Sequence, residues 1–322
     1  MKKLVRFSFG LLLLVSFACS SDSSGDPVDD TPTTTDDNGG QTGTTGDPRQ
    51  DFPENFQATG SSGADIVSNA DFDRLVVQIA HVTGFRPTQA AMDAFEEYLR
   101  ELTFKEDITI NFLELGSPDE ETLTLSEISE FEIDNRTSYN DGRTLAIYIY
   151  FADSPSDDDE EDEGLVTLGA VYRNTSMVIF ESTIRSLANR SALITLADLE
   201  TATLNHEFGH LFGLVNLGTP TINDHEETTT DENNEVIGNN HCNVDGCLMR
   251  AELQFTAAKS FAANRIQNLH NPSCQVSASQ FIKTLESRVS KGLVAPPIID
   301  TECRLDIEAI GARITSNSAK GY

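Results

Sequence analysis

The pattern of apolar positions predicts strands and helices from about residue 61 to the end of the chain. Short apolar or alternating runs predict β-strands at 75–82, 108–115, 145–151, 165–172 and 177–181. Apolar residues at helical spacing predict helices at 88–102, 123–131, 196–214, 255–269 and 278–289. This length of chain is sufficient for one sizeable α+β domain with two lobes around a cleft.

The predicted helix at 196–214 is apolar nearly all round, which indicates that it is buried. It nevertheless carries His206, Glu207 and His210 within about one turn. Two histidines four residues apart lie on one face of a helix, where both imidazoles can bind the same metal ion. Glu207 stands where a carboxylate can take a proton from a zinc-activated water, and Gly213 stands where the helix should end. Hydrogen-bonded buried histidines are the alternative interpretation.

A hydrolytic zinc site takes three protein ligands and leaves one position for water. The candidates for the third ligand are His225 and His241, with Asn216 and Asp224 (or a glutamate) as further alternatives. An amide is a poor zinc ligand beside imidazole, which disfavours Asn216.

The motif and the segment after it resemble the metzincin zinc peptidases. Metzincins carry HExxHxxGxxH and then a turn whose methionine lies under the metal, but this chain has Asn216 at the position of the last histidine. A later stretch contains His241 and Cys242, then Cys247 and Met249. It resembles the archaemetzincins, in which a histidine–cysteine pair begins a C-x4-C-x-M segment. The resemblance implies that Met249 is the methionine of the turn, and it favours His241 because the spacing to Met249 is kept.

The resemblance also implies a fold and an activity. The fold would be that of a metzincin-like zincin: a mixed β-sheet in the N-terminal lobe, then the active-site helix, then a smaller and mainly helical C-terminal lobe. The activity would be that of a zinc-dependent endopeptidase, a hydrolase that acts on proteins or peptides. His206, His210 and His241 (or His225) would hold one Zn²⁺, with Glu207 as the general base. The alternative function is a surface binding or adhesion module on a catalytically silent scaffold.

In metzincins an edge strand beside the active-site helix pairs with extended substrate. The candidate is the strand at 165–172, where Gly169 and Ala170 leave room for a second backbone. A covered or interior strand is the alternative.

Besides Cys19, the chain has four cysteines, which suggests two disulfides in an exported protein. Three pairings of these cysteines are possible, and the favoured one joins Cys242 with Cys247 and Cys274 with Cys303. In the archaemetzincins a C-x4-C pair joins a later C-x2-C pair to hold a second zinc. Cys274 and Cys303 do not have that spacing, so the second zinc site is expected to be absent.

The first residues predict export. Residues 1–18 have a basic start and a short apolar run, and they resemble a lipoprotein signal peptide with Cys19 as the lipidated residue. Residues 19–60 form a polar, acidic tether that has too few apolar residues to fold. The resulting expectation is an outer-membrane lipoprotein that faces the cell surface, touches the membrane only through its anchor and is monomeric.

The formal net charge of −30 disfavours nucleic-acid binding, which needs a basic surface. The acidic run at 157–163 indicates a solvated loop, with a Ca²⁺-binding loop as the alternative.

Overall fold

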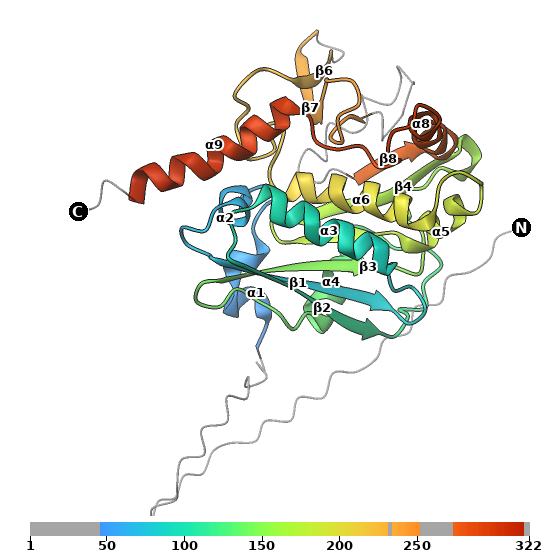
Figure 1. Cartoon of the computed structure of the whole chain (residues 1–322). Coiled ribbons are helices and arrows are strands. Elements are labelled where there is room, and N and C mark those ends of the chain that lie inside the picture. Colours follow the sequence, from blue (N-terminus) through green and yellow to red (C-terminus); the bar gives the residue numbers. More distant parts are fainter. Residues whose placement is uncertain (1–45, 231–233, 252–272, 319–322) are drawn as a thin grey trace, which may run out of the picture. The chain divides into compact units, whose positions relative to one another are not determined.

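A six-stranded mixed β-sheet organises the domain (Figure 1). This computed structural model describes residues 46–230, 234–251 and 273–318, all within the unit that runs from Thr44 to Tyr322. The predicted signal peptide with Cys19, the first part of the tether and the predicted helix at 255–269 lie outside the described residues.

The strand order in the sheet is β2-β1-β3-β5-β4-β8. Strands β1 and β2 are parallel to each other, β3 is parallel to β1, and β5 is parallel to β3. Strand β4 is antiparallel to both β5 and β8, so the predicted mixed sheet is confirmed. The bounds are β1 Arg74–Val82, β2 Asp107–Leu115, β3 Thr144–Phe151, β4 Leu165–Arg173, β5 Ser176–Ile179 and β8 Ser273–Ser277.

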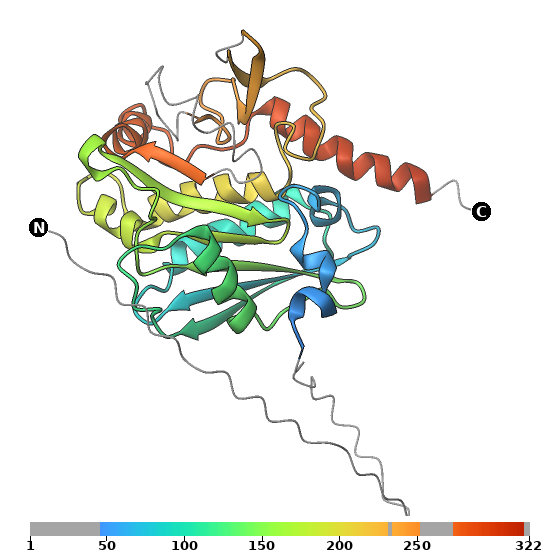
Figure 2. The ribbon, with the colours of Figure 1, turned by 180° about the vertical axis from the view of Figure 1, so that it is seen from behind.

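Helices cover both faces of the sheet. Helices α3 (Gln89–Leu102), α5 (Glu181–Ala188) and α6 (Leu196–Leu211) lie over one face (Figure 1). Their apolar side chains form the larger core with β1 and β3. Helix α4 (Leu125–Asn135) covers the other face, where Ile128 packs in a second core (Figure 2).

Strand β4 does not form the edge of the sheet, so its expected role as a substrate-pairing edge strand is wrong. Strand β8 pairs with it from Leu165↔Ser277 to Ala170↔Ser273. Strand β8 thus covers the first part of β4, strand β5 pairs with its second part, and the two registers meet at Ala170. Strand β8 was not predicted, because it is short and has no strong apolar pattern. Its extended conformation depends on pairing with β4.

The segment between α6 and Met249 contains a two-stranded hairpin, a region in which the sequence predicted no strand. Strands β6 (Glu226–Thr230) and β7 (Val236–Cys242) pair antiparallel and lie above the sheet (Figure 1). The threonines of β6 favour strand structure, although they carry little apolar signal. Two C-terminal helices follow, α8 (Ala278–Ser290), which was predicted, and α9 (Thr301–Ser318), which was not.

The folded unit begins before residue 61. Helix α1 (Pro48–Asp51) and the 3-10 helix η1 (Pro53–Phe56) are ordered, and a short helix α2 (Gly63–Val67) follows. The side chain of Asn55 is buried and donates to Ala146 O at 3.2 Å and Thr175 Oγ1 at 3.3 Å. These polar contacts hold a segment that has few apolar residues.

No helix in the described part of the chain is long and apolar enough to cross a bilayer.

Candidate metal centre

Helix α6 carries the two histidines of the motif through the core. It begins with a capping box, in which Asp198 N donates to Thr195 Oγ1 at 3.2 Å and Thr195 N donates to Asp198 Oδ2 at 2.9 Å. Every residue from Leu199 to Leu211 is buried. The chain leaves the helix at Gly213, whose φ of +72° suits a residue without a Cβ.

His241, at the end of β7, meets His206 and His210 above α6. Each histidine offers one ring nitrogen, and these nitrogens all lie within 4.8 Å of one another. The ring centroids of His206 and His241 are 5.5 Å apart, and those of His210 and His241 are 4.9 Å apart. All three side chains are buried. The structure thus brings together the three histidines that the resemblance favoured.

Two of these histidines have the hydrogen bonding of metal ligands. His206 Nδ1 lies 2.7 Å from Leu248 O, and His241 Nδ1 lies 2.7 Å from Asn239 O. A ring nitrogen that donates to a carbonyl leaves Nε2 as a lone-pair donor. The Nε2 atoms of His206 and His241 are buried and have no hydrogen-bond partner within the described residues. Such buried atoms are costly unless something ligates them, so the donor set fits a bound zinc ion.

The electrostatics of the cluster keep the rings neutral. Burial, and then repulsion from His241, lower the pKa of His206 to about 3. Burial lowers the pKa of His241 to about 4 and holds the pKa of His210 well below its usual range. A neutral imidazole is the form that binds a metal, so the cluster needs no deprotonation at neutral pH.

Glu207 lies between α6 and β4. Its side chain is buried, and Gly169 on β4 faces it so closely that a Cβ atom there would lie 2.6 Å from Glu207 Cγ. The absence of a side chain at residue 169 therefore makes room for the carboxylate.

Met249 packs against Gly209 of α6, next to the histidines. It is buried, and a Cβ atom on Gly209 would overlap its Sδ. The backbone of the same turn is tied to the site, because Leu248 O contacts His206 and Met249 O accepts from Cys242 N at 2.8 Å.

The other candidates for the third ligand lie outside the histidine cluster. His225 Nε2 contacts Asp306 Oδ2 at 2.8 Å, and His225 Nδ1 lies 3.4 Å from Cys242 Sγ. Burial opposes its protonation, but these hydrogen bonds raise the pKa of His225 overall. Asn216 Nδ2 donates to Glu226 Oε2 at 2.7 Å. Asp224 is not among the grouped ligands of the described residues.

A second group of metal-ligating side chains lies next to the first. Sulfur atoms of Cys242, Cys247 and Cys303 and a carboxylate oxygen of Asp300 all lie within 4.8 Å of one another. Hydrogen bonds from Cys242 and Cys303 lower the pKa of Cys247, which favours its thiolate form.

This arrangement corrects the expected disulfides. Cys242, Cys247 and Cys303 are free thiols, and the Sγ atoms of Cys247 and Cys303 are 3.7 Å apart, far beyond the length of a disulfide bond. Neither Cys242–Cys247 nor Cys274–Cys303 is therefore bonded. The reason is that Asp300 and Cys303, spaced as D-x2-C at the start of α9, bring a carboxylate and a thiol to the cysteines of the turn. The D-x2-C spacing is visible in the sequence, with an aspartate in place of the first cysteine of a C-x2-C pair.

The described side chains of the acidic run at 157–163 belong to neither metal-ligating group. Part of the run is used in local structure, since Asp159 Oδ1 accepts from Thr167 N at 2.6 Å.

A comparison with solved structures finds a similar protein. No family model matches the chain, and no curated protein matches it. The chain is similar to the crystal structure of archaemetzincin from Methanopyrus kandleri, with 12% identity and a TM-score of 0.42. The similarity covers 74% of this chain and 96% of that chain.

Proposed function

We propose that the protein is a zinc-dependent endopeptidase, with His206, His210 and His241 as the ligands of one zinc ion. The observation that carries the proposal is the convergence of three buried, neutral imidazoles beside a buried carboxylate, Glu207. A structural zinc needs no such carboxylate, whereas a hydrolytic site does. When bound, zinc supplies the Lewis acidity that activates water and polarises the scissile carbonyl.

Residues of the chain orient the ligands and transfer the proton. Carbonyl contacts at Nδ1 orient His206 and His241, so that Nε2 of each faces the centre of the cluster. The Glu207 carboxylate takes a proton from the attacking water and passes it to the leaving amine. The buried surroundings of Glu207 exclude bulk water and strengthen its interaction with that proton.

The test compares turnover with metal content. The zinc-loaded protein is incubated with a mixed peptide library beside its Glu207→Gln variant. We expect cleavage by the native protein and none by the variant, with zinc still bound in both. Glu200→Gln is the matched control, because it makes the same exchange two turns earlier on α6, where Glu200 accepts from Thr88 N at 3.0 Å instead of facing the histidines.

Cleavage by Glu207→Gln would contradict the mechanism. No cleavage by the native protein, with zinc present, would favour a binding module on the same scaffold.

We also propose a second, structural zinc ion held by Cys242, Cys247, Cys303 and Asp300. Four Zn–S bonds of about 2.3 Å in a tetrahedron place their sulfur atoms about 3.8 Å apart, close to the 3.7 Å between Cys247 and Cys303. The donors are three sulfurs and one carboxylate, a closed set that leaves no position for water. We expect two zinc ions per chain, and one after Cys247→Ser with Cys303→Ser. A native stoichiometry of one would contradict the second site.

For the ends of the chain we propose export as a lipoprotein. Residues 1–18 would be removed, Cys19 would be lipidated, and the acidic tether would hold a monomeric catalytic unit outside the outer membrane. Labelling of Cys19 with a palmitate analogue, lost in Cys19→Ala, tests this proposal.

A further inference from the structure

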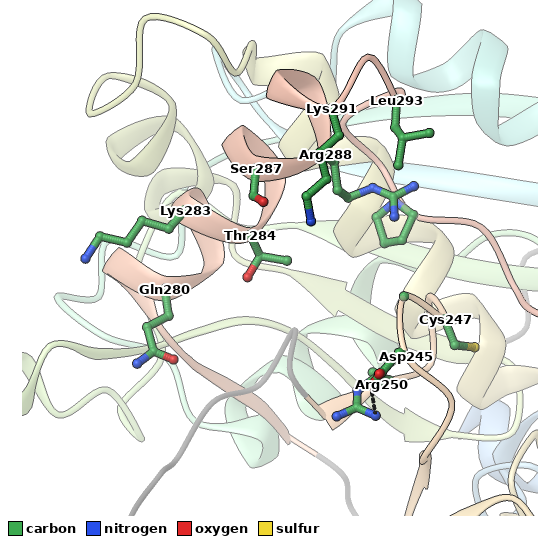
Figure 3. A pocket seen from close by; sticks show the side chains of 12 residues that line it. Asp245, Cys247, Arg250, Gln280, Lys283, Thr284, Ser287, Arg288, Lys291 and Leu293 are labelled. Carbon is green, nitrogen blue, oxygen red and sulfur yellow. Dashed lines mark ion pairs between the residues drawn. The ribbon is translucent and has the colours of Figure 1, made fainter.

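A pocket of about 650 Å³ opens between the turn that carries Met249 and helix α8 (Figure 3). Four basic side chains line it, namely Arg250, Lys283, Arg288 and Lys291. Among the lining residues that the structure describes, Asp245 is the one acidic side chain. This concentration of positive charge stands out in a chain with 22 basic and 52 acidic residues.

Helix α8 presents its polar face to the pocket. Gln280, Thr284, Ser287 and Lys291 follow one another at helical spacing and line one wall. The opposite face of the helix is apolar and buried, for example at Leu285. The hydroxyl groups of Thr284 and Ser287 and the ammonium group of Lys291 point toward the turn that contains Arg250 (Figure 3).

The basic residues are not all committed to the protein's own carboxylates. Arg288 Nε donates to Ala295 O at 3.1 Å and supports the segment that closes the pocket. Arg250 pairs with Asp245 at 3.1 Å and donates to Asn243 O at 2.6 Å, so its guanidinium group is engaged within the protein. Lys283 and Lys291 form no ion pair within the described residues, so both can bind an external anion.

The rim of the pocket is apolar. Leu293 lines it, and the next segment exposes Val294 and Ile298, at 69% and 67%. Cationic and hydroxyl donors beside exposed aliphatic side chains match a peptide with acidic and apolar residues better than a small free oxyanion.

The pocket also lies close to the histidine cluster. Arg250 directly follows Met249, which packs against Gly209 of α6, and Leu248 O contacts His206. Neighbouring Cα atoms are about 3.8 Å apart, so the wall of the pocket is only a few residues of extended peptide away from the zinc site.

We propose that this pocket binds acidic side chains of the peptide that the protein cleaves, and so makes the enzyme selective for acidic substrates. This inference rests on the proposed peptidase function. Its chemistry is the pairing of substrate carboxylates with Lys291 and Lys283, supported by the hydroxyl groups of Thr284 and Ser287.

The test measures binding without turnover. Full-length, zinc-loaded Glu207→Gln protein is titrated with a fluorescent peptide that contains glutamates and with its glutamine counterpart. We expect the acidic peptide to bind roughly 3- to 10-fold more tightly, as two exposed charge pairs would give. Lys283→Gln with Lys291→Gln should remove this difference. Asp245→Asn should increase it, because the competing carboxylate is gone.

The control variant is Arg74→Gln, which removes one positive charge at the exposed start of β1. Equal binding of the two peptides, or an equal loss in the control, would overturn the proposal. Displacement of the acidic peptide by inorganic phosphate at matching concentration would also overturn it, since the ligand would then be a small oxyanion.

The experiments distinguish an error in the pocket proposal from an error in the proposed peptidase function. Cleavage by the native protein with no preference for acidic peptides would remove the pocket proposal alone. Lysine-dependent binding of the acidic peptide without cleavage by the native protein would remove the peptidase and, with it, the role in substrate selection.

Discussion

Gly169 on β4 faces Glu207 on α6 at a distance that no side chain could occupy. A Cβ atom at residue 169 would lie 2.6 Å from Glu207 Cγ and 3.1 Å from its Oε1. The position of the carboxylate is therefore determined as much by the strand as by the helix that carries it.

Gly169→Ala should reduce peptide cleavage by about 10- to 100-fold, because a displacement of roughly 1 Å in a catalytic group costs this much. Zinc content should not change, since residue 169 faces Glu207 rather than the imidazoles. Steady-state kinetics and metal analysis check both points. Gly116→Ala is the matched control, because its Cβ would meet nothing within 4 Å. Native activity in Gly169→Ala would show that the carboxylate can move aside without loss.

Gly209→Ala should destabilise the protein, although alanine is the better helix former. The propensity gain is about 1 kcal/mol, whereas forcing an extra carbon against buried Met249 costs about 1–3 kcal/mol. Chemical denaturation measures the net loss. In a double-mutant cycle, Met249→Ala should make Gly209→Ala harmless or favourable, which would prove that the two residues are coupled. Simple additivity of the two changes would argue against the contact.

His241→Gln should lose the zinc of the histidine cluster and all activity, and His225→Gln should retain activity. The reason is that His241 shares the cluster with His206 and His210, whereas His225 contacts Asp306 and Cys242. His225→Gln should still cost about 1–3 kcal/mol of stability, because Asp306 is buried and loses its partner. Activity assays and thermal unfolding separate the two effects. The reverse pattern of activity would make His225 the third ligand.

The zinc-free protein should lose stability as the pH falls from about 6.5 toward 4. The folded-state pKa values of His206 and His241 are lowered to about 3 and about 4, whereas the unfolded values lie near 6.5. In this interval the unfolded chain binds protons that the folded chain does not, so the free energy of unfolding falls by about 1 kcal/mol per pH unit for each histidine.

Denaturation of metal-free protein across this interval measures the slope. A His206→Gln, His241→Gln double variant should have a smaller slope, and an unchanged slope would show that other groups cause it.

Local patterns in the sequence were sufficient to predict the main strands of the sheet and the helix that carries the histidine motif. Strand β3 is a continuous apolar run, and α6 combines buried apolar residues with two histidines one turn apart, so both could be predicted from neighbouring residues alone. The candidate roles of Glu207 and Met249 could also be predicted, because each role depends on spacing to neighbouring residues within a short segment. In each case the information lies within a few turns or strands of the residue concerned.

Features that depend on distant contacts could not be predicted in this way. The position of His241 above α6 requires the hairpin β6–β7, whose polar strands have no apolar pattern. Asp300 becomes a candidate ligand only because Leu248 N donates to Ile298 O at 2.9 Å and brings the start of α9 to the turn. The expected disulfides were wrong because cysteine counting takes no account of a carboxylate that shares the same group.

The pairing of β8 with β4 also affects how the chain reaches its native state. Leu165 pairs with Ser277, which is synthesised or translocated more than a hundred residues later. This edge of the sheet therefore cannot form until late in the process. Until then β4 presents unpaired amide and carbonyl groups that could join another chain edge to edge. The nascent protein thus remains prone to aggregation until the five residues of β8 pair with β4. C-terminal truncation before β8 should leave β4 unpaired and the chain prone to aggregation.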